Sequence, residues 1–188
     1  MKTVVLASQS PRRKELLTQA GIEFTVQPSV KEEIYDPAET PDNIVASLAL
    51  QKAEEVFAQH PEAVVIGSDT MVAIDGKMLG KPKDEEEAAR MLKQLSGRTH
   101  QVHTGAAILS KEDRTVFTET VQVTFYPLTE SEINTYIQSK EPADKAGAYG
   151  IQGLGAVLVE RIEGDYFSIV GLPVAKVVRA LKKHGIQL

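Results

Sequence analysis

The most constraining feature of the sequence is the apolar run from Ala63 to Ile66, which continues through Gly67 and Ser68 to Asp69. Near-continuous apolar runs of this length are typical of strands that are buried inside a sheet. A second run of this kind covers residues 3–7. Further strands are expected at 22–27, 101–109, 115–125, 156–161 and 166–170. A short hairpin is also expected after Met71, because Asp75-Gly76 can form its two-residue turn.

Helix-capping signals separate these strands. Helices are expected to begin after Ser10, Thr40, Asp84, Thr129 and Pro173. Two of the starts carry the capping-box pattern, with Glu87 three residues after Asp84 and Glu132 three residues after Thr129. Strands and helices are mixed without regular alternation. The sequence therefore predicts an α/β protein, or alternatively an α+β protein, with a mixed sheet and flanking helices.

Length and composition narrow the protein class. The 188 residues suit a single domain over 1–188, and 42% hydrophobic residues exclude a disordered chain. The net charge of −5 is the wrong sign for coating nucleic acid. Cysteine is absent, and no apolar stretch approaches the roughly 20 residues of a membrane span. No signal peptide is recognisable at the N-terminus, so we expect a cytoplasmic protein without membrane contact.

The first helix begins with an unusual basic turn. Arg12, Arg13 and Lys14 stand where the helix dipole is already positive and where acidic residues normally occur. A bound anion such as a polyphosphate would reverse this penalty, because backbone N–H groups and guanidinium groups converge there. The alternative is a solvated surface turn whose cations pair with Glu15 or with other acids.

Asp69 is the principal candidate for an acid–base residue. It ends the apolar run, and small residues before it allow another group to approach closely. An acid at the carboxyl end of a strand is a candidate metal ligand or general base, whereas the alternative is a turn-forming aspartate. Glu32 and Glu33 lie in the polar segment before the second helix, and their residue types alone predict only solvated carboxylates.

Two lysines are candidates for contact with negative charge. Lys52 lies on the apolar stripe of the second helix, four residues after Leu48. It either lines a site that holds anions or extends its ammonium group past the apolar surface to water. Lys81 is fixed between Gly80 and Pro82 after the expected hairpin.

The segment 146–155 is rich in glycine and contains Gln152 as the one amide that could read a base edge. Its glycine spacing does not match the dinucleotide fingerprint, and no phosphate-binding G-x-x-x-x-G-K-[ST] motif is present. Taken alone, the segment is better explained as a tight loop between a helix and a strand. The four histidines have no metal-binding spacing, so a histidine zinc site is not expected.

Several ordered motifs together resemble those of the Maf (septum-formation inhibitor) family of nucleotide pyrophosphatases. They are Ala7-Ser-Gln-Ser-Pro-Arg-Arg-Lys-Glu-Leu-Leu17, Gly67-Ser-Asp-Thr70, Gly80-Lys-Pro82, Lys145-Ala-Gly-Ala-Tyr-Gly-Ile-Gln-Gly153, Gly164-Asp-Tyr166 and Gly171-Leu-Pro173. The resemblance covers essentially the whole chain.

The resemblance implies hydrolysis of a nucleoside triphosphate to the monophosphate and diphosphate, with Mg²⁺ or Mn²⁺ as cofactor. It also implies two lobes around a cleft, as in the inosine-triphosphate pyrophosphatases, and a homodimer. By motif, Asp69 would activate the water, and Glu33 and Asp69 would be metal carboxylates. The residues implied to bind or neutralise phosphates are Ser8, Arg12, Arg13, Lys52 and Lys81.

Three positions are similar to the branch of the family that favours dTTP, UTP and modified uridine triphosphates such as 5-methyl-UTP and pseudo-UTP. That branch carries Arg, Thr and Gln where this chain has Arg12, Thr70 and Gln152. A branch associated with 7-methyl-GTP carries an aromatic residue, Gln and Glu instead. A glutamine amide offers both a donor and an acceptor, which suits the pyrimidine O4 and N3–H edge.

Three rival hypotheses remain at this point. One is a related pyrophosphatase for another altered nucleotide, such as inosine triphosphate. A second is a regulatory protein of septum formation that senses nucleotides without turnover. The third, a nucleic-acid-binding protein, is disfavoured by the net charge and by an aromatic content of only 5%.

Overall fold

The computed structural model describes residues 1–187, and within them the strands form one seven-stranded mixed sheet. The strand order is β2-β1-β3-β5-β6-β7, and β4 pairs with β3 off this path. The strands are β1 (Val4–Leu6), β2 (Thr25–Val26), β3 (Val64–Ile74), β4 (Lys77–Leu79), β5 (Thr99–Leu109), β6 (Arg114–Phe125) and β7 (Val159–Glu163). Strand β1 is parallel to β2 and β3, whereas β4 and β7 are antiparallel to their neighbours. The predicted mixed sheet is confirmed.

Helices flank this sheet. They are α1 (Pro11–Gln19), α2 (Pro41–Gln59), α3 (Glu85–Leu95), α4 (Glu130–Gln138), α5 (Tyr166–Val170) and α6 (Val174–Lys183). Three 3₁₀ turns cover Glu141–Asp144, Ala146–Ala148 and Gly153–Leu158. Within residues 1–187, no helix combines the length and the apolar character needed to cross a membrane.

The chain divides into two compact units. The first comprises Met1–Asp69, Thr104–Glu119 and the segment from Gly171 onward, and the second comprises Thr70–His103 and Thr120–Val170. The boundaries fall inside β3, β5 and β6, so each of these strands contributes residues to both units. The single-domain organisation and the cleft stay predictions.

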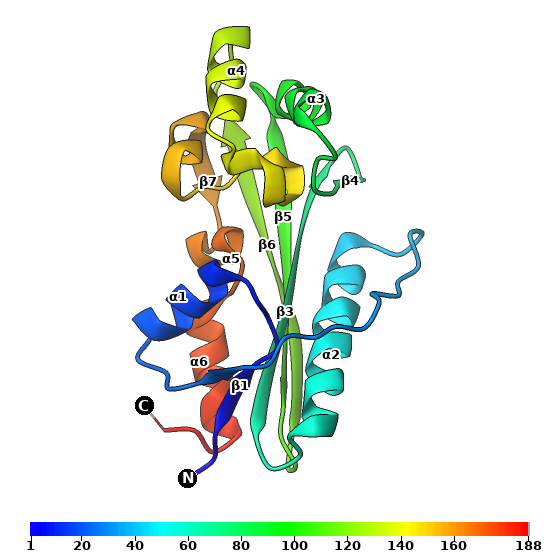
Figure 1. The fold of residues 1–188 in the computed structure, drawn as a ribbon, viewed down its shortest axis with the longest axis vertical. Coiled ribbons are helices and arrows are strands. Elements are labelled where there is room, and N and C mark those ends of the chain that lie inside the picture. The colour runs from blue at the N-terminus through cyan, green and yellow to red at the C-terminus, as the bar shows by residue number, and fades with distance from the viewer. Residues whose placement is uncertain (188) are drawn as a thin grey trace. The chain divides into compact units, whose positions relative to one another are not determined.

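In the first unit, α2 packs its backbone directly onto the sheet. Figure 1 shows α2 on one side of β1 and β3, and α1 and α6 on the other. A Cβ atom built on Gly67 would lie 2.2 Å from the carbonyl oxygen of Ala49, and one built on Gly105 would lie 2.2 Å from that of Val45. Only glycine permits this approach, which fixes the position of α2 on β3 and β5.

In the second unit, three rings form the centre of the core. His100, Phe125 and Tyr149 pack edge to face, with centroids 4.7 to 5.3 Å apart. His100 Nε2 and the Tyr149 hydroxyl form a buried hydrogen bond of 2.6 Å. Burial lowers the pKa of His100 to about 4, so this histidine is a neutral residue of the core at neutral pH.

The predicted helix starts are confirmed, with one difference in detail. The side chains of Ser10, Thr40, Asp84 and Thr129 all cap their helices, and Thr129 and Glu132 form a complete capping box. At α3 the Asp84 carboxylate accepts from Glu87 N, but the Glu87 carboxylate accepts from Lys83 N. The capping box predicted here was therefore wrong in one respect, because the glutamate side chain accepts from the residue before the N-cap and not from the N-cap itself.

Near the C-terminus one strand prediction was wrong, and another placed the start of its strand three residues too early. Residues 166–170 form α5, because the Asp165 carboxylate accepts hydrogen bonds from both Ser168 N and Ser168 Oγ and so caps a helical turn. Residues 156–158 belong to a 3₁₀ turn, and β7 begins only at Val159. The hairpin turn is confirmed, since Asp75 and Gly76 both adopt positive φ angles before β4.

Candidate active site

Asp69 lies inside β3, whereas the sequence had predicted it at the end of a strand. The strand continues because Val72, Ala73 and Ile74 pair with β4. The preceding Ser68 hydroxyl is buried and hydrogen-bonds to the carbonyl oxygens of Gly105 and Gly171, at 2.8 and 3.1 Å. Asp69 itself is only 8% exposed, so its carboxylate is held in a largely dehydrated environment.

The Lys52 ammonium group joins two carboxylates that are distant in sequence. Lys52 Nζ lies 2.7 Å from Asp69 Oδ1 and 3.0 Å from Glu33 Oε1. Lys52 reaches this position from α2, and its side chain is only 17% exposed, so it does not extend into bulk water. The polar segment before α2 carries Glu33, whose side chain is half exposed. Two acids and one lysine from three separate segments of the chain therefore meet in one cluster.

Burial raises the pKa of Asp69 above its ordinary value. The attraction of Lys52, its hydrogen bond and the charge of Arg13 act in the opposite direction, and repulsion by Glu33 adds to the rise. Desolvation outweighs the cations, which gives a carboxylate with a greater affinity for a proton than a surface aspartate has. A buried carboxylate with a raised pKa is a candidate proton acceptor.

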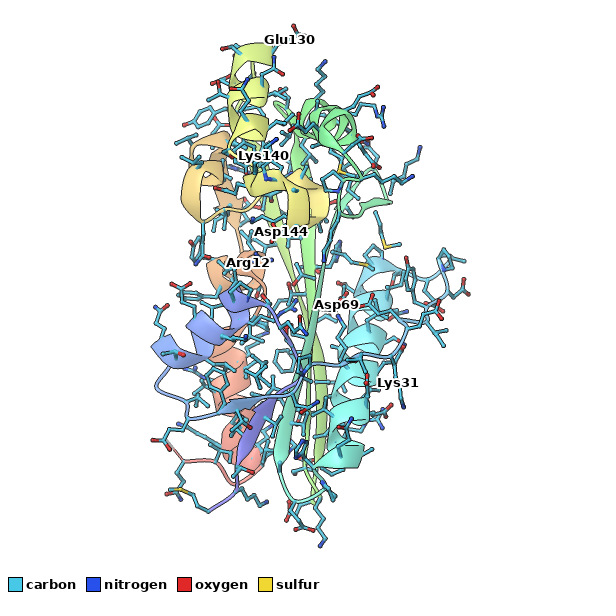
Figure 2. The ribbon with its side chains drawn as sticks, in the orientation of Figure 1. Arg12, Lys31, Asp69, Glu130, Lys140 and Asp144 are labelled. Atoms are coloured by element: carbon cyan, nitrogen blue, oxygen red, sulfur yellow. The ribbon has the colours of Figure 1, made fainter. Side chains whose placement is uncertain are left out.

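The basic turn of α1 is held to the rest of the first unit by Arg13. Its Nε donates to the carbonyl oxygen of Gly171 at 2.7 Å, and its Nη1 donates to Ser8 Oγ at 3.3 Å. Burial lowers the pKa of Arg13, while the charge of Asp69 raises it. A guanidinium group remains protonated in such a setting. Figure 2 labels Arg12 at the start of this helix, and Arg12 is half-buried.

The remaining predicted residues belong to the second unit. Thr70 follows Asp69 on β3, Lys81 is exposed after β4, and Gln152 is half-buried before the 3₁₀ turn at 153–158. Gly147 N donates to Gly80 O at 3.1 Å, which places the segment of Lys81 against the glycine-rich segment.

One carboxylate organises the glycine-rich segment of this unit. Glu141 accepts hydrogen bonds from Leu154 N, Gly155 N and the Tyr136 hydroxyl, at 2.8 to 3.1 Å. The Tyr136 oxygen accepts in turn from Gly150 N at 3.1 Å. The two ends of the loop that carries Gln152 are therefore fixed to the same pair of side chains.

The site residues predicted from the sequence thus fall into two groups. Ser8, Arg12, Arg13, Glu33, Lys52 and Asp69 lie in the first unit, and Thr70, Lys81 and Gln152 lie in the second. Their roles in binding phosphate, base or metal stay predictions. Sequence reasoning missed Gln51 and Glu55, whose polar groups contact the segment that carries Glu33. Glu55 follows Leu48 by seven residues on α2, and the helical spacing that singled out Lys52 could also have found it.

A family model described as Maf-like protein matches residues 3–184. The chain belongs to the Maf family. The resemblance inferred from the ordered motifs is confirmed.

Curated relatives of this Maf protein cover it almost completely. The dTTP/UTP pyrophosphatase of Bacillus velezensis is 55% identical over 186 residues, which is 99% of this chain and 98% of that protein. The dTTP/UTP pyrophosphatase of Bacillus pumilus is 56% identical over 187 residues, with the same two coverages. Among solved structures, the Ham1 protein of Staphylococcus aureus aligns with a TM-score of 0.49 and 18% identity, over 84% of this chain and 80% of that one.

Proposed function

We propose that this Maf protein is a nucleoside triphosphate pyrophosphatase that hydrolyses dTTP, UTP and modified pyrimidine nucleotides to the monophosphate and diphosphate. The names of relatives at 55% and 56% identity support this substrate class. The observation that supports hydrolysis is the buried Asp69 carboxylate, whose Oδ1 lies 2.7 Å from Lys52 Nζ. We assign the protein a house-cleaning role in the cytoplasm, and we propose that it acts as a homodimer.

Asp69 acts as the proton acceptor for the attacking water. Its raised pKa favours proton uptake, while Lys52 stabilises the ionised form that must be present before the reaction. The oxygen of the water forms a new bond to the α-phosphorus. The bond from that phosphorus to the bridging oxygen breaks, and diphosphate leaves. The proton of the water passes to the Asp69 carboxylate.

The cations predicted to bind phosphate hold the triphosphate and stabilise its developing charge. Arg12 and Arg13 act together with the N-terminal N–H groups of α1, where the helix dipole attracts anions. Ser8, Lys52 and Lys81 complete the set of phosphate-binding residues. Such groups accelerate phosphoryl transfer mainly by positioning and by electrostatic stabilisation.

Gln152 reads the base, with Thr70 and Arg12 as further specificity residues. The glutamine amide donates to the pyrimidine O4 and accepts from N3–H, whereas a glutamate could only accept. Because Glu141 fixes the backbone on the C-terminal side of Gln152, the amide is presented from an ordered segment.

We propose that acidic residues of the first unit hold a divalent cation, Mg²⁺ or Mn²⁺, beside the Lys52 ammonium group that already contacts them. Within residues 1–187, no three acidic or histidine side chains gather as a complete ligand set. Magnesium sites in nucleotide enzymes commonly use only one or two carboxylates together with substrate phosphates and water. We therefore propose that Glu33 and Asp69 hold the cation. Its chemistry there is to offset the negative charge of the triphosphate.

Pyrophosphate release from a panel of canonical and modified triphosphates tests the proposal. We expect release from dTTP and UTP with Mg²⁺ or Mn²⁺, and no release with chelator. Asp69→Asn should lower turnover by about 100- to 10,000-fold while nucleotide binding persists. Asp36→Asn, at an exposed aspartate of the same unit, is the matched control and should leave turnover unchanged.

Two results would contradict the proposal. Near-normal turnover of Asp69→Asn would remove Asp69 from the reaction. A protein that binds nucleotides but releases pyrophosphate from none of them would instead be a nucleotide sensor, in line with a regulatory role in septum formation.

A further inference from the structure

Glu55 is a buried carboxylate that the proposed reaction does not use. It lies on α2 and is only 7% exposed. Its two oxygens accept hydrogen bonds from the Ser29 hydroxyl, from Val30 N at 2.9 Å and from Lys31 N at 3.2 and 3.3 Å. These three donors belong to consecutive residues, so one side chain fixes the start of the polar segment that leads to Glu33.

Gln51, one helical turn before Glu55, fixes the other end of the same segment. Its Nε2 donates to Ile34 O at 2.7 Å, and its Oε1 accepts from Ile34 N at 3.2 Å. A second bond from Nε2 to Ser47 Oγ, at 3.0 Å, orients the amide on the helix. We call Gln51 and Glu55 the α2 clamp.

Apolar packing does not account for the position of this segment. Val30 is 82% exposed and Ile34 is 74% exposed, and residues 27–39 contain neither helix nor strand. The hydrogen bonds of the α2 clamp therefore supply much of what orders residues 29–34. Figure 2 labels Lys31 in this segment, which runs beside α2.

Glu33 lies between the two clamped ends. Its Oε1 is 3.0 Å from Lys52 Nζ, and Lys52 lies on the same helix as both members of the α2 clamp. One rigid helix thus holds the backbone on both sides of Glu33 and also carries the cation that its carboxylate contacts.

Resting on the proposed function, we propose that Gln51 and Glu55 are positioning residues that hold the Glu33 carboxylate beside Lys52 and Asp69 and thereby maintain kcat. Interactions that orient a catalytic or metal-binding group typically account for 10- to 100-fold in activity or affinity. Burial of Glu55 raises its pKa, but the hydrogen bonds from Ser29, Val30 and Lys31 outweigh this effect and lower the pKa overall. These hydrogen bonds therefore favour the ionised form of Glu55 in its buried position.

The substitution Glu55→Gln tests the proposal, because a carboxylate has two acceptor oxygens whereas an amide has only one. The NH₂ group of the amide donates and therefore cannot accept from any of the three donors. We expect amide exchange at Val30 and Lys31 to become about tenfold faster or more, and kcat to fall by about 10- to 100-fold. Gln51→Ala should accelerate exchange at Ile34 and also lower kcat. Gln51→Ala removes no buried charge, so it keeps the test valid if Glu55→Gln fails to fold.

The matched control is Glu54→Gln, the same substitution on the adjacent residue. Glu54 is half exposed and pairs with Arg114 at 3.2 Å, away from the clamped segment. We expect exchange at Val30, Lys31 and Ile34, as well as kcat, to match the wild type in this variant.

A double-mutant cycle separates positioning from general stability. In a Glu33→Gln background, Glu55→Gln should lower kcat by less than about threefold, because the group through which it acts is already lost. An undiminished effect in that background would overturn the proposal, and so would accelerated exchange with unchanged kcat. A wild-type protein without turnover would overturn the proposed function and the catalytic part of this inference. Amide exchange at the three residues would still decide whether the α2 clamp orders the segment.

Discussion

Gly67→Ala should destabilise the protein and impair its proposed reaction by displacing α2. A Cβ atom at residue 67 would lie 2.2 Å from Ala49 O, 2.9 Å from Ala53 N and 3.0 Å from the Ala53 Cβ. Contacts below 3.0 Å are not tolerated, so relief from 2.2 to 3.0 Å requires a shift of about 0.8 Å. Two of the three contacts are with backbone atoms, which cannot rotate away, and the whole helix must therefore move.

The magnitude follows from two opposing effects. Overpacking against a backbone costs about 3 kcal/mol, near the upper end of its usual range. Replacing glycine reduces the entropy of the unfolded chain and returns about 0.4 to 1 kcal/mol. The net loss of about 2 kcal/mol corresponds to a melting temperature lower by about 4 to 8 °C for a chain of this size.

The same shift should also reach the candidate active site. Residues 67 and 69 point to the same face of β3, and Lys52 is carried by the displaced helix. A displacement of about 1 Å in a catalytic group costs on the order of 100-fold in rate. We therefore expect turnover in Gly67→Ala to fall more than its stability alone would explain, when both are measured well below the melting temperature.

Gly80→Ala is the matched control for this experiment. Nothing lies within 4 Å of a Cβ atom at Gly80, and its backbone does not adopt a positive φ. We expect its melting temperature to stay the same or to rise slightly. If Gly67→Ala behaves like Gly80→Ala in differential scanning calorimetry, the inferred close packing of α2 on β3 is incorrect.

Two further predictions concern the chemistry of the site. Lys52→Met removes the cation that lowers the pKa of Asp69, so this pKa should rise further. Because the reaction needs ionised Asp69, activity is lost as the pH falls through that pKa, and the acid limb of the pH–rate profile should move to higher pH. An unmoved limb would show that Lys52 does not control Asp69. Gln152→Glu should lower kcat/KM for dTTP and UTP by about 10- to 100-fold with little change in melting temperature. An unchanged nucleotide profile would exclude base reading by Gln152.

The helix starts were predictable because their signals are local. Ser10, Thr40 and Thr129 each accept a backbone N–H three residues later, and this bond depends only on residue type and spacing. The same logic could have identified α5 from Asp165 and Ser168. The apolar residues 166–170 instead favoured a strand, since β-propensity depends on context more than capping does.

The candidate site was predictable as a set of residues but not as a geometry. Residue type and position singled out Lys52 and Asp69, and the resemblance to the Maf family singled out Glu33, but no spacing rule could place one ammonium group against both carboxylates. That arrangement depends on the close approach of α2 to β3 at Gly67, a contact between segments distant in sequence. The role of Glu55 was hidden for the same reason, because its partners lie 24 to 26 residues earlier in the chain.

The α2 clamp ends at Ile34, and a different set of hydrogen bonds forms the tip of the same connection. Residues 35–39 are exposed, and the bonds from Ala38 N and Glu39 N to Asp36 form a turn before α2 begins at Pro41. The Glu39 carboxylate also accepts from Asn43 Nδ2 of α2 at 2.8 Å. Since the chain contains no cysteine, a single thiol introduced at Ala38 would be a unique attachment point for a fluorophore. The turn thus offers a place where a reporter can be attached without occupying any group that holds Glu33.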